Sequence, residues 1–70
     1  MNKEYLDKFG KYLKTIRKEK GLTQDDVGIN GISRQMVSHI ELAISDTTIT
    51  KLKVIADNLN LKVKDLFDFE

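Results

Sequence analysis

Two neighbouring side chains, Arg34 and Gln35, are of the types that read base edges in the DNA major groove. A guanidinium can donate two hydrogen bonds to O6 and N7 of guanine, and a glutamine amide can pair with N6 and N7 of adenine. Three further polar side chains lie in the same short segment: Ser33, Ser38 and His39. Val37 and Ile40 stand three residues apart and predict the buried face of a helix, which leaves the polar residues on the opposite face.

A short capped segment precedes this polar face. Thr23 can cap a helix that begins at the next residue, and Asp26 completes a Thr-x-x-Asp capping box. Gly28 and the following Asn30-Gly31 pair break the helical pattern within two turns. The segment therefore predicts a second helix that is short.

The helix that holds the polar face is expected over about Ser33–Leu42, with Ser33 as its N-cap. A short capped helix, a turn containing glycine and a second capped helix are typical of a helix-turn-helix, here at about residues 23–42. The second helix of that motif enters the major groove of double-stranded DNA, with its N-terminal residues toward the bases. Ile32 and Val37 would then pack between the two helices.

Three further helices are expected around this motif. Apolar residues at steps of three and four predict a first helix that is capped by Asn2 and followed by Gly21: Leu6, Phe9, Leu13 and Ile16. A fourth helix is expected over Ile49–Leu59, between Thr48 and Asn60, and a short fifth over Val63–Phe67. The fold class is thus all-α, a compact bundle of five short helices, with residues 1–70 as one helix-turn-helix domain.

Composition excludes several functional classes. The 70 residues include no cysteine and one histidine, so thiol chemistry, disulfides and Cys/His metal sites are not expected. A core this small leaves little room for a substrate cleft, and no catalytic constellation is present; neither an enzyme nor a cofactor is expected. No apolar run is long enough to cross a membrane, and the N-terminus does not resemble a signal peptide. We therefore expect a cytoplasmic protein.

The net charge of +1 is unevenly distributed. Residues 1–20 hold seven basic and three acidic side chains, whereas residues 21–49 hold only Arg34 against four acidic ones. Any electrostatic attraction to an anionic partner is thus expected from the first segment. Its helix-1 lysines either form a solvated face or include phosphate contacts: Lys3, Lys8, Lys11, Lys14 and Lys18.

Three stretches together resemble a known family. These are IRKEKGLTQ (residues 16–24), GISRQMVSHIE (residues 31–41) and the segment over residues 48–67, which ends in Asp65-Leu66-Phe67. In this order and spacing they are similar to the phage Cro and phage repressor (XRE-like) helix-turn-helix family, over residues 6–67. The resemblance implies a phage-repressor-like DNA-binding domain of bacterial or phage origin, acting on double-stranded DNA as a sequence-specific transcriptional regulator, a repressor. Because a single module of this size has limited affinity, a homodimer is also expected.

The resemblance also implies residue roles. Thr23 and Gln24 match the start of the family's second helix, where phosphate is contacted. Arg17 and Glu41 match a structural salt bridge between the first and third helices. The groove-facing, base-contacting positions are matched by Ser33, Arg34, Gln35, Ser38 and His39.

The sequence departs from the family pattern at two places. The connection from the second helix to the third is one residue shorter than usual, and Gly28 stands where alanine is common, which predicts a truncated second helix and an altered crossing. In addition, Lys62 replaces the usual Ser/Thr cap of the last helix.

The segment after Glu41 also differs, because the usual backbone-binding cation is missing and apolar residues stand there instead. Leu42 and Ile44 either cover the core or form a surface for a protein partner; we expect the first for Leu42 and the second for Ile44. An alternative function is therefore a protein-interaction module, an antirepressor or antitoxin, using this loop. Phe69 is free to pack within the chain or to join a dimer contact, for which the fifth helix with Phe67 is the expected surface.

Overall fold

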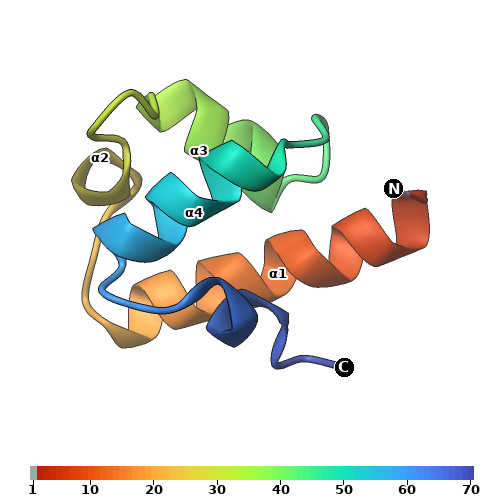
Figure 1. Ribbon diagram of the computed structural model, residues 1–70. Helices are drawn as coiled ribbons and strands as arrows, with labels where there is room; N and C mark the ends of the chain where they lie inside the picture. The colour runs from red at the N-terminus through yellow and green to blue at the C-terminus, as the bar shows by residue number, and fades with distance from the viewer. Residues whose placement is uncertain (1) are drawn as a thin grey trace.

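Helices account for all of the regular secondary structure in residues 2–70, which are the residues that the computed structural model describes. The elements are α1 (Lys3–Glu19), α2 (Gln24–Val27), α3 (Arg34–Glu41), α4 (Ile49–Asn58) and a 3-10 helix, η1 (Val63–Phe67). Figure 1 shows them wound into a small bundle. The predicted all-α fold class is therefore confirmed, with the fifth helix in 3-10 rather than α geometry.

Side-chain caps set where the α-helices begin. Asn2, Ser33 and Thr48 each accept a hydrogen bond from the backbone N–H three residues later, which satisfies one of the free donors of the first turn. Helix η1 has no such side-chain cap, but the Asp65 carboxylate accepts from the Lys62 N–H at 2.9 Å. Asn60, which follows the expected fourth helix, is left-handed, with φ of 62°.

The core is a single apolar cluster to which every helix contributes. Helix α1 packs on α3 and on η1, α2 packs on α3 and α4, and α4 packs on η1. Figure 1 places α3 and η1 on opposite sides of the bundle. The buried cluster consists of Phe9, Leu13, Val27, Ile32, Val37, Ile40, Leu52, Ile55, Ala56, Leu59 and Leu66. Because α3 buries only one side against this cluster, its other side faces outward.

Helices α1 and α3 meet at a glycine. A methyl group added at Gly10 would lie 2.6 Å from the carbonyl oxygens of both Ile40 and Glu41. These carbonyls end α3, so their positions are held by the helix and cannot give way as a flexible side chain can. Gly10 therefore sets how closely α1 approaches the C-terminal end of α3.

The variant Gly10→Ala is expected to lower the free energy of unfolding by about 1–3 kcal/mol, because the added methyl group overpacks this crossing. Helix propensity alone would act in the opposite direction and stabilise by up to about 1 kcal/mol. The sign of the change in a urea titration thus decides between the two effects. A stabilised variant would contradict the close packing at Gly10.

Helix α2 is a single turn, and this confirms the truncation predicted from the shortened connection. A methyl group at Gly28 would lie 2.6 Å from the backbone nitrogen of Arg34. The short connection brings the end of α2 against the start of α3, and alanine no longer fits there. The short connection and the glycine at position 28 are therefore two parts of one structural feature.

The C-terminal Phe69 packs against α1. Its ring centroid lies 5.5 Å from Tyr5, 5.6 Å from Tyr12 and 6.3 Å from Phe9, and Phe67 stacks on Phe9 at 5.1 Å. Such distances are those of favourable aromatic pairs. Phe69 thus takes the intrachain packing that was one of its two expected roles.

No helix within residues 2–70 is long and apolar enough to cross a membrane.

Candidate nucleic-acid interface

The outward face of α3 carries the predicted polar set. Ser33, Arg34 and Gln35 at its N-terminal end are exposed, and Ser38 and His39 one turn later are partly exposed. Val37 and Ile40 of the same helix are buried, as its period predicts, and Met36 is half-buried. All five side chains therefore lie on or beside one accessible helix face.

Two of these side chains already have partners within the chain. The Ser33 hydroxyl accepts from the Met36 N–H at 3.0 Å, so its oxygen caps α3 and its proton remains available to donate. The Arg34 guanidinium lies 3.8 Å from a carboxylate oxygen of Asp25, and both side chains are largely exposed. Exposed pairs of this kind contribute about 0–1 kcal/mol, so Arg34 can leave Asp25 at small cost.

Beneath this face lies a buried ion pair between α1 and the end of α3. Arg17 Nε donates to Glu41 Oε2 at 2.7 Å and a terminal nitrogen donates to Oε1 at 3.1 Å, with the side chains 8% and 2% exposed. The other terminal nitrogen donates to the carbonyl of Leu22 at 2.7 Å. The hydrogen bonds to Glu41 raise the pKa of Arg17 above its ordinary value. The guanidinium thus connects three segments: helix α1, the loop that precedes α2, and the end of helix α3.

Gln24, the first residue of α2, is held by the same ion pair. Its side-chain amide donates to Glu41 Oε1 at 3.2 Å. The carboxylate therefore accepts from both Arg17 and Gln24, which fixes the amide of Gln24 beside the outward face of α3. A side chain expected to meet phosphate is in this way positioned by a buried charge.

Thr23 closes the capping box that the sequence predicts. Its hydroxyl accepts from the Asp26 N–H at 3.2 Å, and its own N–H donates to the Asp26 carboxylate at 2.7 Å. Hydrogen bonds from the Thr23 N–H and hydroxyl lower the pKa of Asp26. The stabilisation of α2 by this carboxylate is therefore present at neutral pH and is lost as the pH falls through that lowered value.

The turn between α2 and α3 is held by a residue that the sequence analysis did not identify. Asn58, the last residue of α4, donates to the carbonyls of Val27 and Ile29 at 2.9 and 3.0 Å and accepts from Asn30 at 2.9 Å. The turn itself has positive φ at Asn30 and Gly31, the pair that the sequence predicts to break the helical pattern. Asparagine supplies both donors and an acceptor from one amide, and it thereby ties α4 to the turn.

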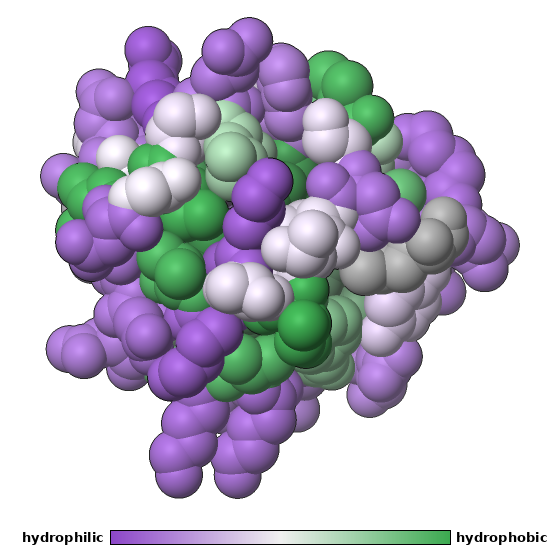
Figure 2. Space-filling view, turned by 45° about the horizontal axis from the view of Figure 1, so that its top comes forward, coloured by the Kyte–Doolittle hydropathy of each residue, from purple (hydrophilic) through white to green (hydrophobic). Residues whose placement is uncertain are grey.

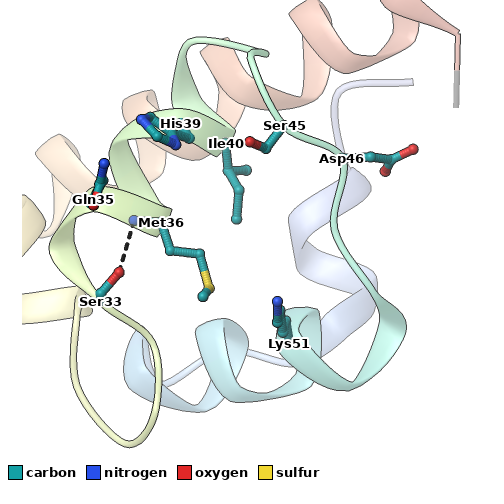
Figure 3. A pocket seen from close by; sticks show the side chains of 8 residues that line it. All are labelled: Ser33, Gln35, Met36, His39, Ile40, Ser45, Asp46 and Lys51. Carbon is teal, nitrogen blue, oxygen red and sulfur yellow. Dashed lines mark hydrogen bonds between the residues drawn. The ribbon is translucent and has the colours of Figure 1, made fainter.

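A hollow of about 460 Å³ lies between α3 and α4 (Figure 3). In Figure 3, Met36 and Ile40 extend from α3 toward α4, and Lys51 extends from α4 into the same space. The residues that line it are Ser33, Gln35, Met36, His39, Ile40, Ser45, Asp46 and Lys51. One wall of this hollow thus consists of expected base-contacting side chains, and a lysine stands on the other wall.

The loop after α3 differs from one expectation. Leu42 does not fold back onto the core: it is 60% exposed. Ala43, with φ of 57°, turns inward in its place and is buried, and its carbonyl accepts from Lys3 Nζ at 3.2 Å. Ile44 is 65% exposed. The left-handed residue reverses the chain so that the small side chain, rather than the leucine, meets the core.

Seen from the side turned forward in Figure 2, the surface is mostly hydrophilic and is interrupted by separate apolar patches. Among residues 2–70, no three His, Cys, Asp or Glu side chains are grouped as a metal site would require. This face therefore offers mainly polar side chains for contact.

Residues 13–66 match the helix-turn-helix family. The match covers more than half of the chain and includes α2, α3 and the turn between them, in agreement with the resemblance of the motifs. No curated protein and no solved structure matches the chain at a significant level.

Proposed function

Because the chain belongs to the helix-turn-helix family, a family of DNA-binding regulators, we propose that it is a sequence-specific transcriptional repressor that reads the major groove with α3. Arg34 and Gln35 contact purine edges from the first turn of α3. The remaining base contacts come from Ser33, Ser38 and His39. Thr23 and Gln24 contact a phosphate at the start of α2.

The observation that carries this proposal is the accessible polar face of α3 on a rigid support. Val37 and Ile40 are buried beneath that face, and the pair of Arg17 and Glu41 fixes the end of the helix. Base contacts need side chains on an element that fits a groove about 12 Å wide, which one α-helix does. The arrangement therefore supports direct reading of bases.

A single module of this size makes few contacts, and we propose that the protein binds as a homodimer. Two copies would place their recognition helices in half-sites about 10 bp apart, or a multiple of that. The surface around η1, with Phe67 and Phe69, is the proposed dimer contact, because η1 packs on α1 and α4 and leaves the outward face of α3 uncovered.

Selection of bound sequences from a random double-stranded DNA library, at low salt, tests this function. The expected result is an enriched motif that is palindromic, with two equal half-sites. A protein that retains DNA without enriching any motif, or that retains none, would contradict sequence-specific binding. An enriched motif with only one half-site would contradict the proposed homodimer but would leave sequence-specific binding supported.

A second function is favoured by the exposure of Leu42 and Ile44: a protein-interaction module that keeps this fold and binds a protein partner through the loop. The variant Ile44→Asp separates the two functions, since the side chain is exposed and the change leaves α3 intact. If regulation in cells is lost while affinity for the selected DNA is unchanged, the loop binds a partner. If both are unchanged, this second function is wrong.

A further inference from the structure

Helix α1 presents two lysines without ion-pair partners beside α3. Lys11 and Lys14 stand three residues apart, so they share one face of the helix, and both are exposed. Two other lysines of α1 form i,i+4 ion pairs with carboxylates. Within residues 2–70, Lys11 and Lys14 have no such partner.

These two lysines line a groove of about 320 Å³ between α1 and α3. Two carboxylates also line it, but each is paired: Asp7 with Lys3 at 3.1 Å and Glu41 with Arg17 at 2.7 Å. The full lining is Asp7, Lys11, Lys14, Gln24, Ser38, Glu41 and Leu42. With its carboxylates neutralised, the groove presents two uncompensated positive charges.

The groove continues into the proposed base-reading surface. A neighbouring hollow of about 260 Å³ is lined by Gln24, Arg34, Gln35 and Ser38. Gln24 and Ser38 line both spaces. The lysines of α1 and the base-contacting residues of α3 therefore stand along one continuous depression.

Lys11 and Lys14 are the lysines that line the groove on this side of α3, and the charge balance around α3 gives them weight. Residues 21–49 hold one cation, Arg34, against four carboxylates, and the loop after α3 supplies no lysine or arginine. DNA binding in general draws much of its affinity from phosphate contacts by cations. On this side of α3, such contacts must come from α1.

We propose that Lys11 and Lys14 form a phosphate-binding site for the DNA strand that borders α3, and so replace the cation missing from the loop. The proposal rests on the proposed function, since the phosphates are those of the same DNA. The site holds the backbone through charge and contributes nothing to base preference. Two phosphates neutralised by the two lysines of one protomer would contribute about 1.8 to the slope of log affinity against log salt, and the four lysines of the homodimer about 3.6.

The test is a salt titration of affinity for the selected DNA site, by fluorescence anisotropy, with the full chain. The double variant Lys11→Gln, Lys14→Gln is compared with the matched control Lys20→Gln, Lys53→Gln. Both remove two exposed lysine charges, but Lys20 and Lys53 line neither the groove between α1 and α3 nor the neighbouring hollow. The charge-retaining variant Lys11→Arg, Lys14→Arg shows whether charge alone suffices.

The double glutamine variant is expected to flatten the salt slope of the homodimer by about 3.6, with its selected motif unchanged, while the control keeps the wild-type slope and the arginine variant restores it. If the Lys11 and Lys14 variant and the Lys20 and Lys53 control change the slope equally, the site is wrong and only overall charge matters. If the wild type selects a motif and the α1 variant keeps its slope, this inference alone fails. Absence of any DNA binding by the wild type overturns the proposed function and this site together.

Discussion

Replacing Arg17 by methionine is expected to lower the free energy of unfolding by about 3–5 kcal/mol, because it leaves the buried carboxylate of Glu41 without its ion-pair partner. The substitution also removes the donor to the carbonyl of Leu22. Since domains have a total stability of about 5–15 kcal/mol, a loss of this size would unfold a substantial fraction of the protein. Urea titration followed by far-ultraviolet circular dichroism measures the change.

Two further variants separate the contribution of the ion pair from other effects. Lys18→Met changes an exposed neighbour on the same helix and is expected to stay within about 0.5 kcal/mol of wild type. Arg17→Met combined with Glu41→Leu removes both charges and should recover much of the loss. The double change also removes the Glu41 carboxylate that accepts the hydrogen bond from Gln24. The double variant should therefore fold but bind DNA more weakly than wild type. A loss below about 1 kcal/mol for Arg17→Met alone would contradict a structural role for the pair.

Replacing Arg34 by alanine is expected to abolish the preference for one base pair in each half-site. A bidentate contact to a guanine is worth about 1–3 kcal/mol of discrimination, which is a factor of about 5–150 in affinity. Stability should be nearly unchanged, because the one ion pair of Arg34 is exposed and loose, at 3.8 Å from Asp25. Repeating the library selection with the variant measures the lost preference directly.

The matched comparison is Lys14→Ala, which removes a cation from the proposed phosphate site. It should weaken binding to all sequences by a similar factor and leave the motif intact. If library selection with the Arg34→Ala variant yields the wild-type preference at every position of the motif, Arg34 does not read a base. If Lys14→Ala loses the preference instead, the roles of the two side chains are reversed.

Local features of the fold were predictable from sequence because short-range chemistry determines them. The capping residues Thr23, Ser33 and Thr48 each accept from a backbone N–H three residues away, and no tertiary contact is needed to form that bond. The left-handed turn at Asn30 and Gly31 follows from their tolerance of positive φ. The resemblance to a family then predicted how these local elements associate.

Features that depend on packing between distant segments were not predictable in this way. Gly10 lies inside an amphipathic helix, where its sequence context suggests only a cost in propensity, and its close contact with the end of α3 exists only in the folded chain. The left-handed turn at Ala43 exposes Leu42 although leucine is the more apolar residue. Asn58 reads as an ordinary polar residue at a helix end until the turn of residues 28–33 is placed against it.

The candidate site shows the same division. The polar face of α3 follows from the period of that helix alone. In contrast, the structure was needed to identify which of the five lysines of α1 could contact phosphate. Lys11 and Lys14 differ from Lys3 and Lys8 in lacking ion pairs, and they line the groove beside α3. The low net charge of the chain thus averages an acidic middle segment with a basic edge that the fold places next to it.

Binding to base-analogue versions of the selected site tests most directly whether α3 reads the major groove. Purines are replaced one at a time by their 7-deaza forms, which remove N7 from the major groove and retain the pairing edge, and guanines are replaced by inosine, which removes a minor-groove amine. The account predicts at least one 7-deaza position per half-site at which affinity falls about fivefold or more, and little change with inosine. Affinity that is unaffected by every 7-deaza substitution, or that falls only with inosine, would contradict major-groove reading by α3.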